Sequence, residues 1–394
     1  MSFQNKRMLI VASDFPFPPV HGGRVDVFAR LKTLYHMGFV IDLIATVKYL
    51  PSEEHIREVN QYVKNIHIVH RANRLIDMFS VIPLQIKSRC GLKDISLEQE
   101  YDFVLLEGQY TSLILDNSTL RAQHFLLRIH NDEPAYFKQL FRSEKLSWAK
   151  LYYLLESYKF KLTDPCIFKK VTNMMFISDK EYREAVAKWP QNNCVFLPPS
   201  ISIANMKVRD LQSKTALFIG AVNHPNNKEA IIWYVKNVHP YLLDIPDYKF
   251  IMAGNSLGKD IGWINELMNE SSHIYFFDTP MDLEPLYQDS AVFVNPMLHG
   301  AGVTLKTVEA IQNGLPVVST LIGSQGTGLR DQTDVLLASE PALFARQVRY
   351  LLQNFEARQR LVCSAQEYLK ENFDTVRILH DYLSNIMHNG RRSI

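Results

Sequence analysis

Residues 298–320, LHGAGVTLKTVEAIQNGLPVVST, contain a small-residue loop, a helix and a buried strand in succession. Residues 300–302 form the loop, and residues 303–313 follow it with the apolar spacing of one helix face. Gly314 stands where such a helix ends, and residues 315–318 resume as a short apolar run typical of a buried strand. The stretch therefore predicts a glycine loop that leads directly into a helix N-terminus.

The expected helix carries Lys306 and Glu309 in its first two turns, three residues apart and hence on one face. A helix N-terminus presents unpaired N–H groups and the positive end of the helix dipole. Glycines let a ligand approach the backbone closely, so the arrangement favours an anion site, with phosphate as the usual ligand. The lysine would neutralise a diphosphate, and the glutamate would accept from two vicinal hydroxyls such as those of a ribose. An ordinary loop, helix and strand with a solvated Lys/Glu pair fits the same spacing.

The composition is that of a soluble globular protein of two domains, with 394 residues, 47% apolar and 21% charged. A net charge of +2 favours neither a nucleic-acid partner nor a strongly acidic one. The four cysteines form no C-x-x-C pair, which indicates free thiols in a reducing compartment. The first apolar run is too short for a signal peptide, and no stretch reaches the roughly 18 to 20 apolar residues that span a bilayer. We therefore expect a cytoplasmic protein, with peripheral contact at the inner face of a membrane left open.

The N-terminal segment predicts a strand, a loop and a helix. Residues 7–12, RMLIVA, have the continuous apolar character of a central parallel strand buried on both faces. A proline-rich segment that ends in Gly22 and Gly23 follows, and residues 24–37 have the pattern of an amphipathic helix. Because ligands of open α/β sheets bind at the carboxyl ends of the strands, this glycine loop is expected to face a ligand, although a plain turn also fits.

Residues 75–87 are largely apolar, with Arg71, Arg74, Lys87 and Arg89 around them. This pattern favours a buried helix with a solvated rim. The alternative is an amphipathic surface that touches a membrane or a lipid-linked substrate.

Short apolar strands and helices alternate through the whole chain, and the pattern restarts after residues 198–200 with the apolar run 216–220, ALFIG. Such alternation predicts an α/β chain with two doubly wound parallel sheets, whose strand ends face each other across a cleft. The expected parts are an N-terminal domain over residues 1–198, a C-terminal domain over residues 199–372, and a final helix within residues 373–394 that packs back on the first domain.

Taken together, these segments resemble glycosyltransferases of the GT-B fold, of the family 4 or glycosyltransferase group 1 type, particularly members that build bacterial polysaccharide and lipopolysaccharide. The resemblance covers nearly the whole chain and implies two Rossmann-like domains. The matching segments are Gly22-Gly23, LRIHN (127–131), IGAVNHPNN (219–227) and GAGVTLKTVEAIQNGLPVVST (300–320). The last one is the most specific, since it is similar to the family variant G-x-G-x-x-x-K-x-x-E-A-x-x-x-G-x-P-V-V.

The resemblance implies a nucleotide-sugar donor held mainly by the C-terminal domain, a glycan or lipid-linked acceptor, and neither a metal nor another cofactor. It assigns the phosphates to Lys306, the ribose hydroxyls to Glu309, and the transferring sugar or leaving phosphate to His130. A hydrogen-bonded histidine at a strand end, with a purely structural role, is the alternative for His130. Lys228 or Arg24 would supply further positive charge. Other expected substrate-binding residues are Gly22, Gly23, Asn131, Asn223, Gly300, Ala301, Gly302, Val303 and Thr304. No D-x-D or H-E-x-x-H motif occurs, which agrees with the expected absence of a metal.

Two positions depart from the family pattern. The common motif has two glutamates eight positions apart, but Ala301 stands eight residues before Glu309. Thr304 occupies the position where an arginine often precedes the lysine by two residues. In the family, the missing carboxylate contacts a hydroxyl of the donor sugar, so the resemblance does not imply which sugar is bound.

The expected reaction is sugar transfer from a nucleotide diphosphate to an acceptor hydroxyl, with retention of anomeric configuration. Stabilisation of the departing diphosphate at the helix N-terminus would be the main catalytic contribution. Three alternatives remain open at this point: a UDP-sugar 2-epimerase of the same fold, an inverting glycosyltransferase with an Asp or Glu base, and a catalytically degenerate nucleotide-sugar-binding scaffold.

Overall fold

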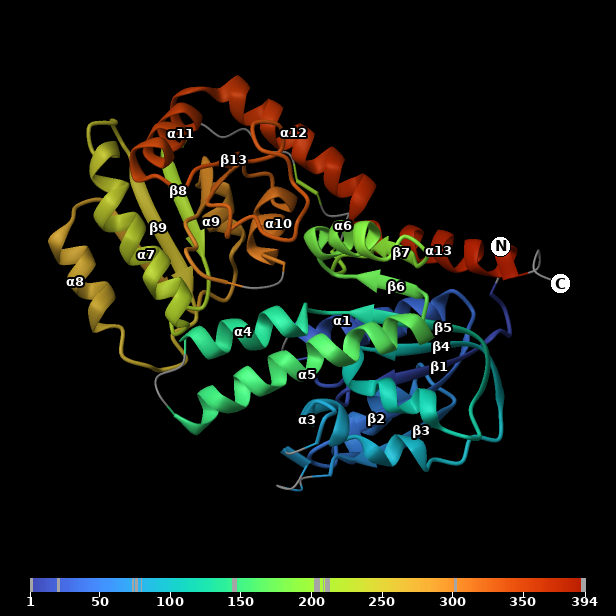
Figure 1. Ribbon diagram of the computed structural model, residues 1–394. Helices are drawn as coiled ribbons and strands as arrows, with labels where there is room; N and C mark the ends of the chain where they lie inside the picture. Colours follow the sequence, from blue (N-terminus) through green and yellow to red (C-terminus); the bar gives the residue numbers. More distant parts are fainter. Residues whose placement is uncertain are drawn as a thin grey trace. The chain divides into compact units, whose positions relative to one another are not determined.

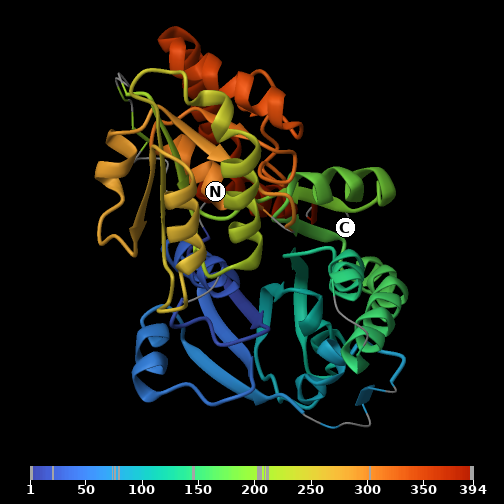
Figure 2. The same ribbon diagram turned by 90° about the vertical axis from the view of Figure 1, so that its left-hand side faces the viewer.

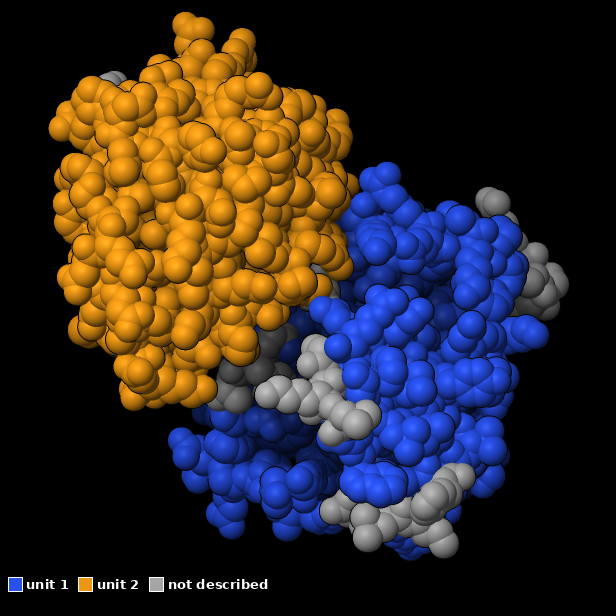
Figure 3. Space-filling view, turned by 60° about the vertical axis from the view of Figure 1, so that its left-hand side comes forward, with its two compact units in different colours: residues 1–200, 375–394 blue, residues 201–374 orange. Residues whose placement is uncertain are grey.

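The computed structural model divides the chain into two compact units (Figure 3). Unit 1 comprises Met1–Ser200 and Thr375–Ile394, and unit 2 comprises Ile201–Asp374. The residues that the structure describes are 3–19, 22–72, 74, 77–78, 80–143, 147–201, 206–207, 209, 213–300 and 303–390.

Within the described residues of unit 1, seven parallel strands form one sheet in the order β3-β2-β1-β4-β5-β6-β7 (Figure 1). The strands are β1 Arg7–Ala12, β2 Val40–Val47, β3 Asn65–His70, β4 Glu100–Glu107, β5 Arg121–Ile129, β6 Asn173–Phe176 and β7 Asn193–Phe196. All neighbouring pairs are parallel, so the carboxyl ends of the strands lie along one edge of the sheet. The strand order reverses between β1 and β4, and this topological switch point is where open α/β sheets bind their ligands.

Helices connect these strands, and several begin at a serine N-cap. Ser52, Ser147 and Ser178 each accept a hydrogen bond from the N–H three residues on. The α-helices are α1 Gly22–His36, α2 Glu53–Asn60, α3 Leu84–Lys87, α4 Glu133–Ser143, α5 Trp148–Lys170, α6 Asp179–Lys188 and α13 Thr375–Gly390, and two 3-10 segments are η2 Cys90–Lys93 and η3 Gln109–Asp116. In both Figure 1 and Figure 2, α4 and α5 lie side by side.

Strand β1 is buried on both faces, as its continuous apolar run predicts. Met8 and Ile10 pack into a cluster with Leu31 of α1, whereas Leu9 and Val11 pack into a second cluster on the other face. The alternation follows from the two-residue period of a strand. Burial of so many large side chains on both faces makes this sheet the rigid support for whatever its carboxyl edge carries.

The C-terminal helix α13 packs on unit 1. Leu379 and Leu383 belong to the same apolar cluster as β1, and the hydroxyl of Tyr382 donates to the carbonyl of Asn193 at 2.5 Å. The last helix of the chain therefore completes the core of the unit that contains the first strand.

In unit 2, the described residues contain six parallel strands in the order β10-β9-β8-β11-β12-β13. The strands are β8 Thr215–Ile219, β9 Lys249–Gly254, β10 Ile274–Asp278, β11 Val292–Asn295, β12 Val317–Ser319 and β13 Leu336–Leu337. The helices are α7 Pro225–Asn237, α8 Gly262–Glu270, α9 Glu284–Gln288, α10 Leu305–Gln312, α11 Pro341–Gln353 and α12 Phe355–Asn372, with η5 at His239–Leu242. Here the topological switch point lies between β8 and β11. The prediction of two doubly wound parallel sheets is confirmed.

Some predicted elements were wrong in extent. Of the helix expected over residues 75–87, the described residues form an α-helix only as α3, because Pro83, directly before it, has an extended backbone. Helices α4 and α8 were not predicted. Helix α1 begins at Gly22, so Gly22 and Gly23 form its first turn rather than a loop before it. No helix among the described residues has the length and apolar character to cross a membrane.

Candidate active site

Helix α10 begins at the switch point of unit 2, as residues 298–320 predict. Thr304 occupies its N-cap position, but the threonine hydroxyl donates to the carbonyl of Gln325 at 3.2 Å and does not cap the helix. The N–H groups of Leu305 and Lys306 have no acceptor among the described residues. These groups and the helix dipole together favour an anion at this position. At the other end, the positive φ of 82° at Gly314 ends the helix as predicted.

The side chain of Lys306 is held in a partly buried position. Its Nζ donates to Oδ1 of Asn227 at 2.7 Å and lies 4.5 Å from the ring centroid of Phe218. Burial lowers the pKa of Lys306 to about 8, although the nearby Glu309 opposes the shift. Among the described residues, the ammonium has no carboxylate within ion-pair distance. A positive charge that is desolvated but not ion-paired gains strongly from an incoming anion.

Gly220 leaves space for the side chain of Lys306, and Gly254 leaves space for the backbone of Gly220. A Cβ at Gly220 would lie 3.0 Å from Nζ of Lys306 and from the amide nitrogen of Asn227. A Cβ at Gly254 would lie 1.9 Å from the carbonyl oxygen of Gly220, which is closer than atoms can approach. The carboxyl ends of β8 and β9 are therefore packed so closely that only glycine fits.

Glu309 lies one turn after Lys306 on α10 and is exposed. Its carboxylate has neither a hydrogen bond nor an ion pair with a described residue. The side chain is therefore free to accept hydrogen bonds from a ligand, as the sequence-based assignment to ribose requires.

A buried polar network holds the start of α10 against the loop that contains Gly323. Nδ2 of Asn295 donates to Oγ1 of Thr307 at 2.9 Å and to the carbonyl of Gly323 at 2.7 Å. Thr307 also donates to Gly323 at 2.6 Å. Asn295 and Thr307 are completely buried, so these hydrogen bonds fix the start of the helix against the loop after β12. Sequence reasoning missed these supporting roles and also the role of Asn227.

The remaining predicted residues of unit 2 are placed as follows. Asn223 follows β8 and lines a cavity of about 340 Å³ together with Lys228, whose Nζ lies 5.1 Å from the ring centroid of Trp263. Oδ1 of Asn223 is buried without a partner. Gly300 and Val303, which precede α10, are partly buried. Ala301 and Gly302 lie outside the described residues.

In unit 1, His130 follows β5 and contacts a buried ionic network at the switch point. Its Nε2 lies 3.3 Å from Oε2 of Glu107, and its Nδ1 lies 3.7 Å from Oδ2 of Asp26. Arg30 forms two hydrogen bonds to Glu107, at 2.6 and 2.8 Å, and one to Asp26. Arg128 binds Asp26 through both Nε and Nη2. His130 is the member with the most exposure, at 22% of its side chain.

The two carboxylates and two guanidiniums of this network balance each other. Burial alone would raise the pKa of Asp26, but Arg128, Arg30 and His130 hold it well below its ordinary value. Burial lowers the pKa of Arg128 to about 10, and Asp26 opposes this. The network therefore keeps its charges at neutral pH and positions the ring of His130 at the edge of the sheet. Sequence reasoning found His130 but not the four residues that hold it.

The other predicted residues of unit 1 do not belong to the ionic network that contacts His130. Gly23 lies in the first turn of α1, and Arg24 binds Asp14 at 2.7 Å, so it is not the free cation suggested by the sequence. Asn131 follows His130, and its carbonyl accepts from the side chain of Gln109 at 3.4 Å.

Three acidic side chains at the same sheet edge were not predicted. Glu133, Asp164 and Glu181 come from three different helices and interact electrostatically. Burial raises the pKa of Glu133 to about 7, although a hydrogen bond from Tyr110 opposes this. Burial and the charge of Glu133 raise the pKa of Asp164 to about 8, and burial raises that of Glu181 to about 7. Because these three residues are far apart in the sequence, no local pattern predicts that they lie close together.

Across the described residues, no group of three or more His, Cys, Asp or Glu side chains has the arrangement of a metal site.

Comparison with known proteins identifies the family. The family model described as "Glycosyl transferases group 1" matches residues 213–354. A Klebsiella pneumoniae protein described as "Uncharacterized 44.6 kDa protein in cps region" is 34% identical over 388 residues, which is 94% of this chain and 97% of that protein.

Two solved structures share the fold. A mutant of S. aureus TarM, in complex with fondaparinux, alpha-GlcNAc-glycerol and UDP, has a TM-score of 0.62 at 11% identity over 96% of this chain and 99% of its own. Anabaena Alr3699/HepE, in complex with UDP-glucose, has a TM-score of 0.60 at 12% identity over 97% of this chain and 99% of its own. These similarities show the GT-B fold. With the family match and the extent of the Klebsiella similarity, the chain belongs to the group 1 glycosyltransferases, enzymes that transfer sugars.

Proposed function

We propose that this enzyme transfers a sugar from a nucleotide-diphosphate sugar to a hydroxyl of a glycan or a lipid-linked saccharide, with retention of configuration and without a metal. The observation that carries the proposal is the uncapped N-terminus of α10 beside Lys306, whose ammonium has no ion-pair partner among the described residues. Two fold neighbours were solved with UDP or UDP-glucose, and the Klebsiella relative belongs to a cps region, which support a nucleotide-sugar donor and a glycan product.

In the proposed reaction, the diphosphate lies at the start of α10, with Lys306 bound to one of its oxygens. Glu309 accepts hydrogen bonds from the ribose hydroxyls. The bond between the anomeric carbon and the phosphate oxygen breaks, and the acceptor oxygen forms a bond to the same carbon on the same face. The acceptor proton passes to the departing phosphate, so no side chain acts as the base.

Stabilisation of charge on the leaving diphosphate is the main source of rate acceleration. Backbone N–H groups and a pre-positioned ammonium stabilise charge that develops in the transition state without having to reorganise. His130 contacts the transferring sugar or the leaving phosphate from unit 1, and its ring orientation is set by Glu107 and Asp26.

The test is a thermal-shift screen of the purified chain with UDP, GDP, ADP and TDP and their sugars, followed by assays of donor hydrolysis and transfer in EDTA. A ligand that binds the folded state raises the melting temperature. We expect one nucleotide to do so and turnover to persist in EDTA. No shift with any nucleotide would reject the donor assignment, and loss of turnover in EDTA that Mg²⁺ restores would reject the metal-free reaction.

The same assay separates the alternatives. Release of an epimerised sugar without an acceptor would identify a 2-epimerase, and the anomeric configuration of the product distinguishes retention from inversion.

A further inference from the structure

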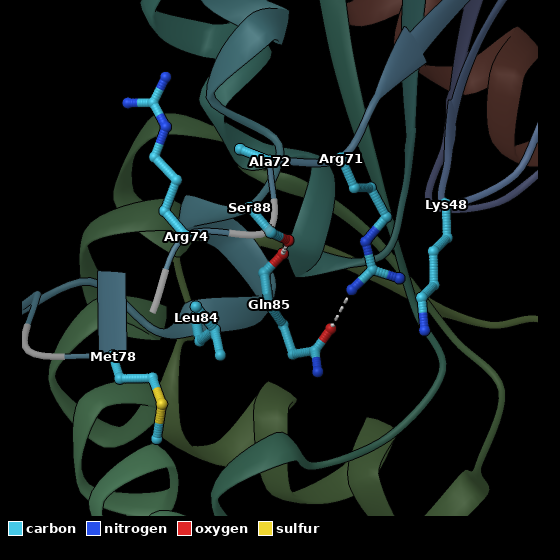
Figure 4. Close-up of a pocket in the computed structure, with 8 residues that line it drawn as sticks. All are labelled: Lys48, Arg71, Ala72, Arg74, Met78, Leu84, Gln85 and Ser88. Atoms are coloured by element: carbon cyan, nitrogen blue, oxygen red, sulfur yellow. Dashed lines mark hydrogen bonds between the residues drawn. The ribbon is translucent and has the colours of Figure 1, made fainter. Parts of the chain in front are cut away.

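A basic pocket lies at the carboxyl ends of β2 and β3 in unit 1 (Figure 4). Lys48 directly follows β2 and Arg71 directly follows β3, so both stand on the same sheet edge as His130. The pocket has a volume of about 230 Å³. Its lining residues are Lys48, Arg71, Ala72, Arg74, Met78, Leu84, Gln85 and Ser88.

The cations of this pocket have no acidic partner among the described residues. Lys48 is exposed, and its Nζ lies 5.3 Å from the ring centroid of Tyr49. Arg71 donates from Nη2 to the neutral Oε1 of Gln85 at 3.0 Å. In Figure 4, Lys48 and Arg71 extend in the same direction, whereas Arg74 extends away from them at the rim. None of the described residues that line the pocket carries a carboxylate.

A further positive charge lies beside the pocket. Arg89 is 2% exposed and donates to neutral oxygens only, including the hydroxyl of Thr46 at 2.8 Å and the carbonyl of Ser13 at 2.8 Å. Burial, and then the charge of Arg71, lower the pKa of Arg89 to about 9. The guanidiniums therefore repel each other across this region, and a bound anion would relieve the repulsion.

Two carboxylates near these cations are already bonded to other groups. Asp14 binds Arg24 at 2.7 Å. Glu156 is fully buried, accepts from the N–H of Leu84 at 2.9 Å and binds Lys159 at 3.2 Å. Neither is available to neutralise Lys48 or Arg71, so the positive charge of the pocket is directed toward a ligand.

The other wall of the pocket is apolar. Met78 and Leu84 lie on this side, away from Lys48 and Arg71 (Figure 4), and Met78 is 38% exposed. Cations on one side and apolar side chains on the other match a phosphate attached to a less polar group. The guanidinium of Arg71 presents several donors in a plane, which suits phosphate oxygens.

We propose that this pocket binds a phosphate group of the acceptor, with Lys48 and Arg71 on the phosphate oxygens and the apolar wall against the adjoining part of the acceptor. The inference rests on the proposed function, because it specifies the acceptor of that reaction. Three strand steps separate β2 from β5, which carries His130, or about 14 Å at ~4.8 Å per step. The phosphate and the accepting hydroxyl are therefore on different parts of an extended acceptor.

The experiment measures binding of defined probes to the full chain by calorimetry. The probes are farnesyl phosphate, farnesol, glucose 1-phosphate and glucuronic acid. The test variant is Lys48→Gln with Arg71→Gln, and Lys64→Gln is the control, because Lys64 is an exposed cation of the same unit outside the pocket. A second double variant, Lys48→Gln with Arg74→Gln, changes only exposed side chains. It replaces the first double variant in the test if that one does not fold.

We expect a phosphate probe to bind the wild type and the control equally, and to bind the Lys48/Arg71 variant on the order of 100-fold more weakly, about tenfold for each cation. Pocket-dependent binding of farnesyl phosphate alone assigns a lipid phosphate, and binding of glucose 1-phosphate assigns a sugar phosphate. Equal binding by variant and wild type, no binding of either phosphate, or glucuronic acid binding as tightly as glucose 1-phosphate, would overturn the proposal.

Nucleotide-sugar binding to the wild type is measured separately, without any probe. If no donor binds, the proposed function fails, whereas the probe measurements still decide whether the pocket takes a phosphate.

Discussion

Two charged regions, one in each unit, lie at the switch points of their sheets and differ in how their charges are compensated. Around His130, two carboxylates and two guanidiniums are buried and fully paired. Around Lys306, the cation is partly buried and bonded only to neutral partners. A paired network gains little from a ligand, so its contribution is to position His130. An unpaired cation beside a helix N-terminus gains directly from an anion, so unit 2 is where the diphosphate is expected.

The largest effect is expected from breaking the paired network. Asp26→Asn leaves the fully buried Arg128 without a carboxylate, and removal of one partner from a buried ion pair costs about 3–5 kcal/mol. Urea unfolding monitored on unit 1 checks this. The matched control is Asp116→Asn, which removes exposed ion pairs with Lys93 and Lys170 and is expected to cost under about 1 kcal/mol. Equal losses of unfolding free energy in the two variants would contradict the distinction between the buried ionic network and an exposed ion pair.

Lys306→Met tests the unpaired region. The variant keeps an apolar stem against Phe218 but removes the charge, so we expect kcat to fall about 100-fold or more while the fold is retained. Steady-state kinetics with the donor found in the screen gives the measurement. Lys236→Met, an exposed lysine of α7, serves as the control and should leave kcat unchanged. A normal kcat in the Lys306 variant would show that this residue does not stabilise the leaving group.

Donor affinity should also depend on pH through Lys306. Its pKa of about 8 in the free protein means that the ammonium is largely protonated at pH 7 and largely neutral at pH 9. A bound diphosphate favours the protonated form, so the Kd for the nucleotide is expected to rise about tenfold from pH 7 to pH 9. Calorimetry at both pH values tests this, with Lys306→Met as the control that should lose the dependence. A pH dependence of equal size in that variant would assign it to another group.

The fold was predictable from sequence because the signals for it are local. β1 was predicted over its observed range, since a short apolar run buried on both faces leaves few alternatives. The helix after Thr304 and its end at Gly314 follow from residue types within one stretch. Where a local rule competed with packing, the prediction was incomplete: the helix predicted over residues 147–161 stops before Pro165. Helix α5 continues through Pro165 because Phe160, Asp164 and Ile167 are buried along it.

The candidate site was predictable only in part. Lys306 and His130 were found from their motifs, but their partners are distant in sequence: Asn227 lies 79 positions from Lys306, and Asp26 lies 102 positions from Arg128. The motif identifies the residue that meets the ligand, whereas the residues that set its charge and orientation depend on the sheet topology.

The smallest effect is expected at the buried acidic side chains of unit 1. The pKa of Asp164 is about 8 in the folded protein and near 3.8 when the chain is unfolded, so the folded state binds the extra proton between these values. The associated stability is present below about pH 4 and is lost as pH rises through about 8. We expect the titration of Asp164 to lower the free energy of unfolding of the wild type by on the order of 1 kcal/mol between pH 6.5 and pH 7.5, close to the ~1.4 kcal/mol per pH unit of a single group.

Asp164→Asn removes that titration and should flatten the decline, and the exposed Glu98→Gln should leave it unchanged. Urea unfolding at the two pH values gives the comparison. If Asp164→Asn declines as steeply as the wild type, this carboxylate is not buried in its protonated form. A flatter profile would instead mean that unit 1 holds two kinds of buried acid at one sheet edge: carboxylates that remain charged because arginines pair with them, and others with a raised pKa that no arginine among the described residues pairs with.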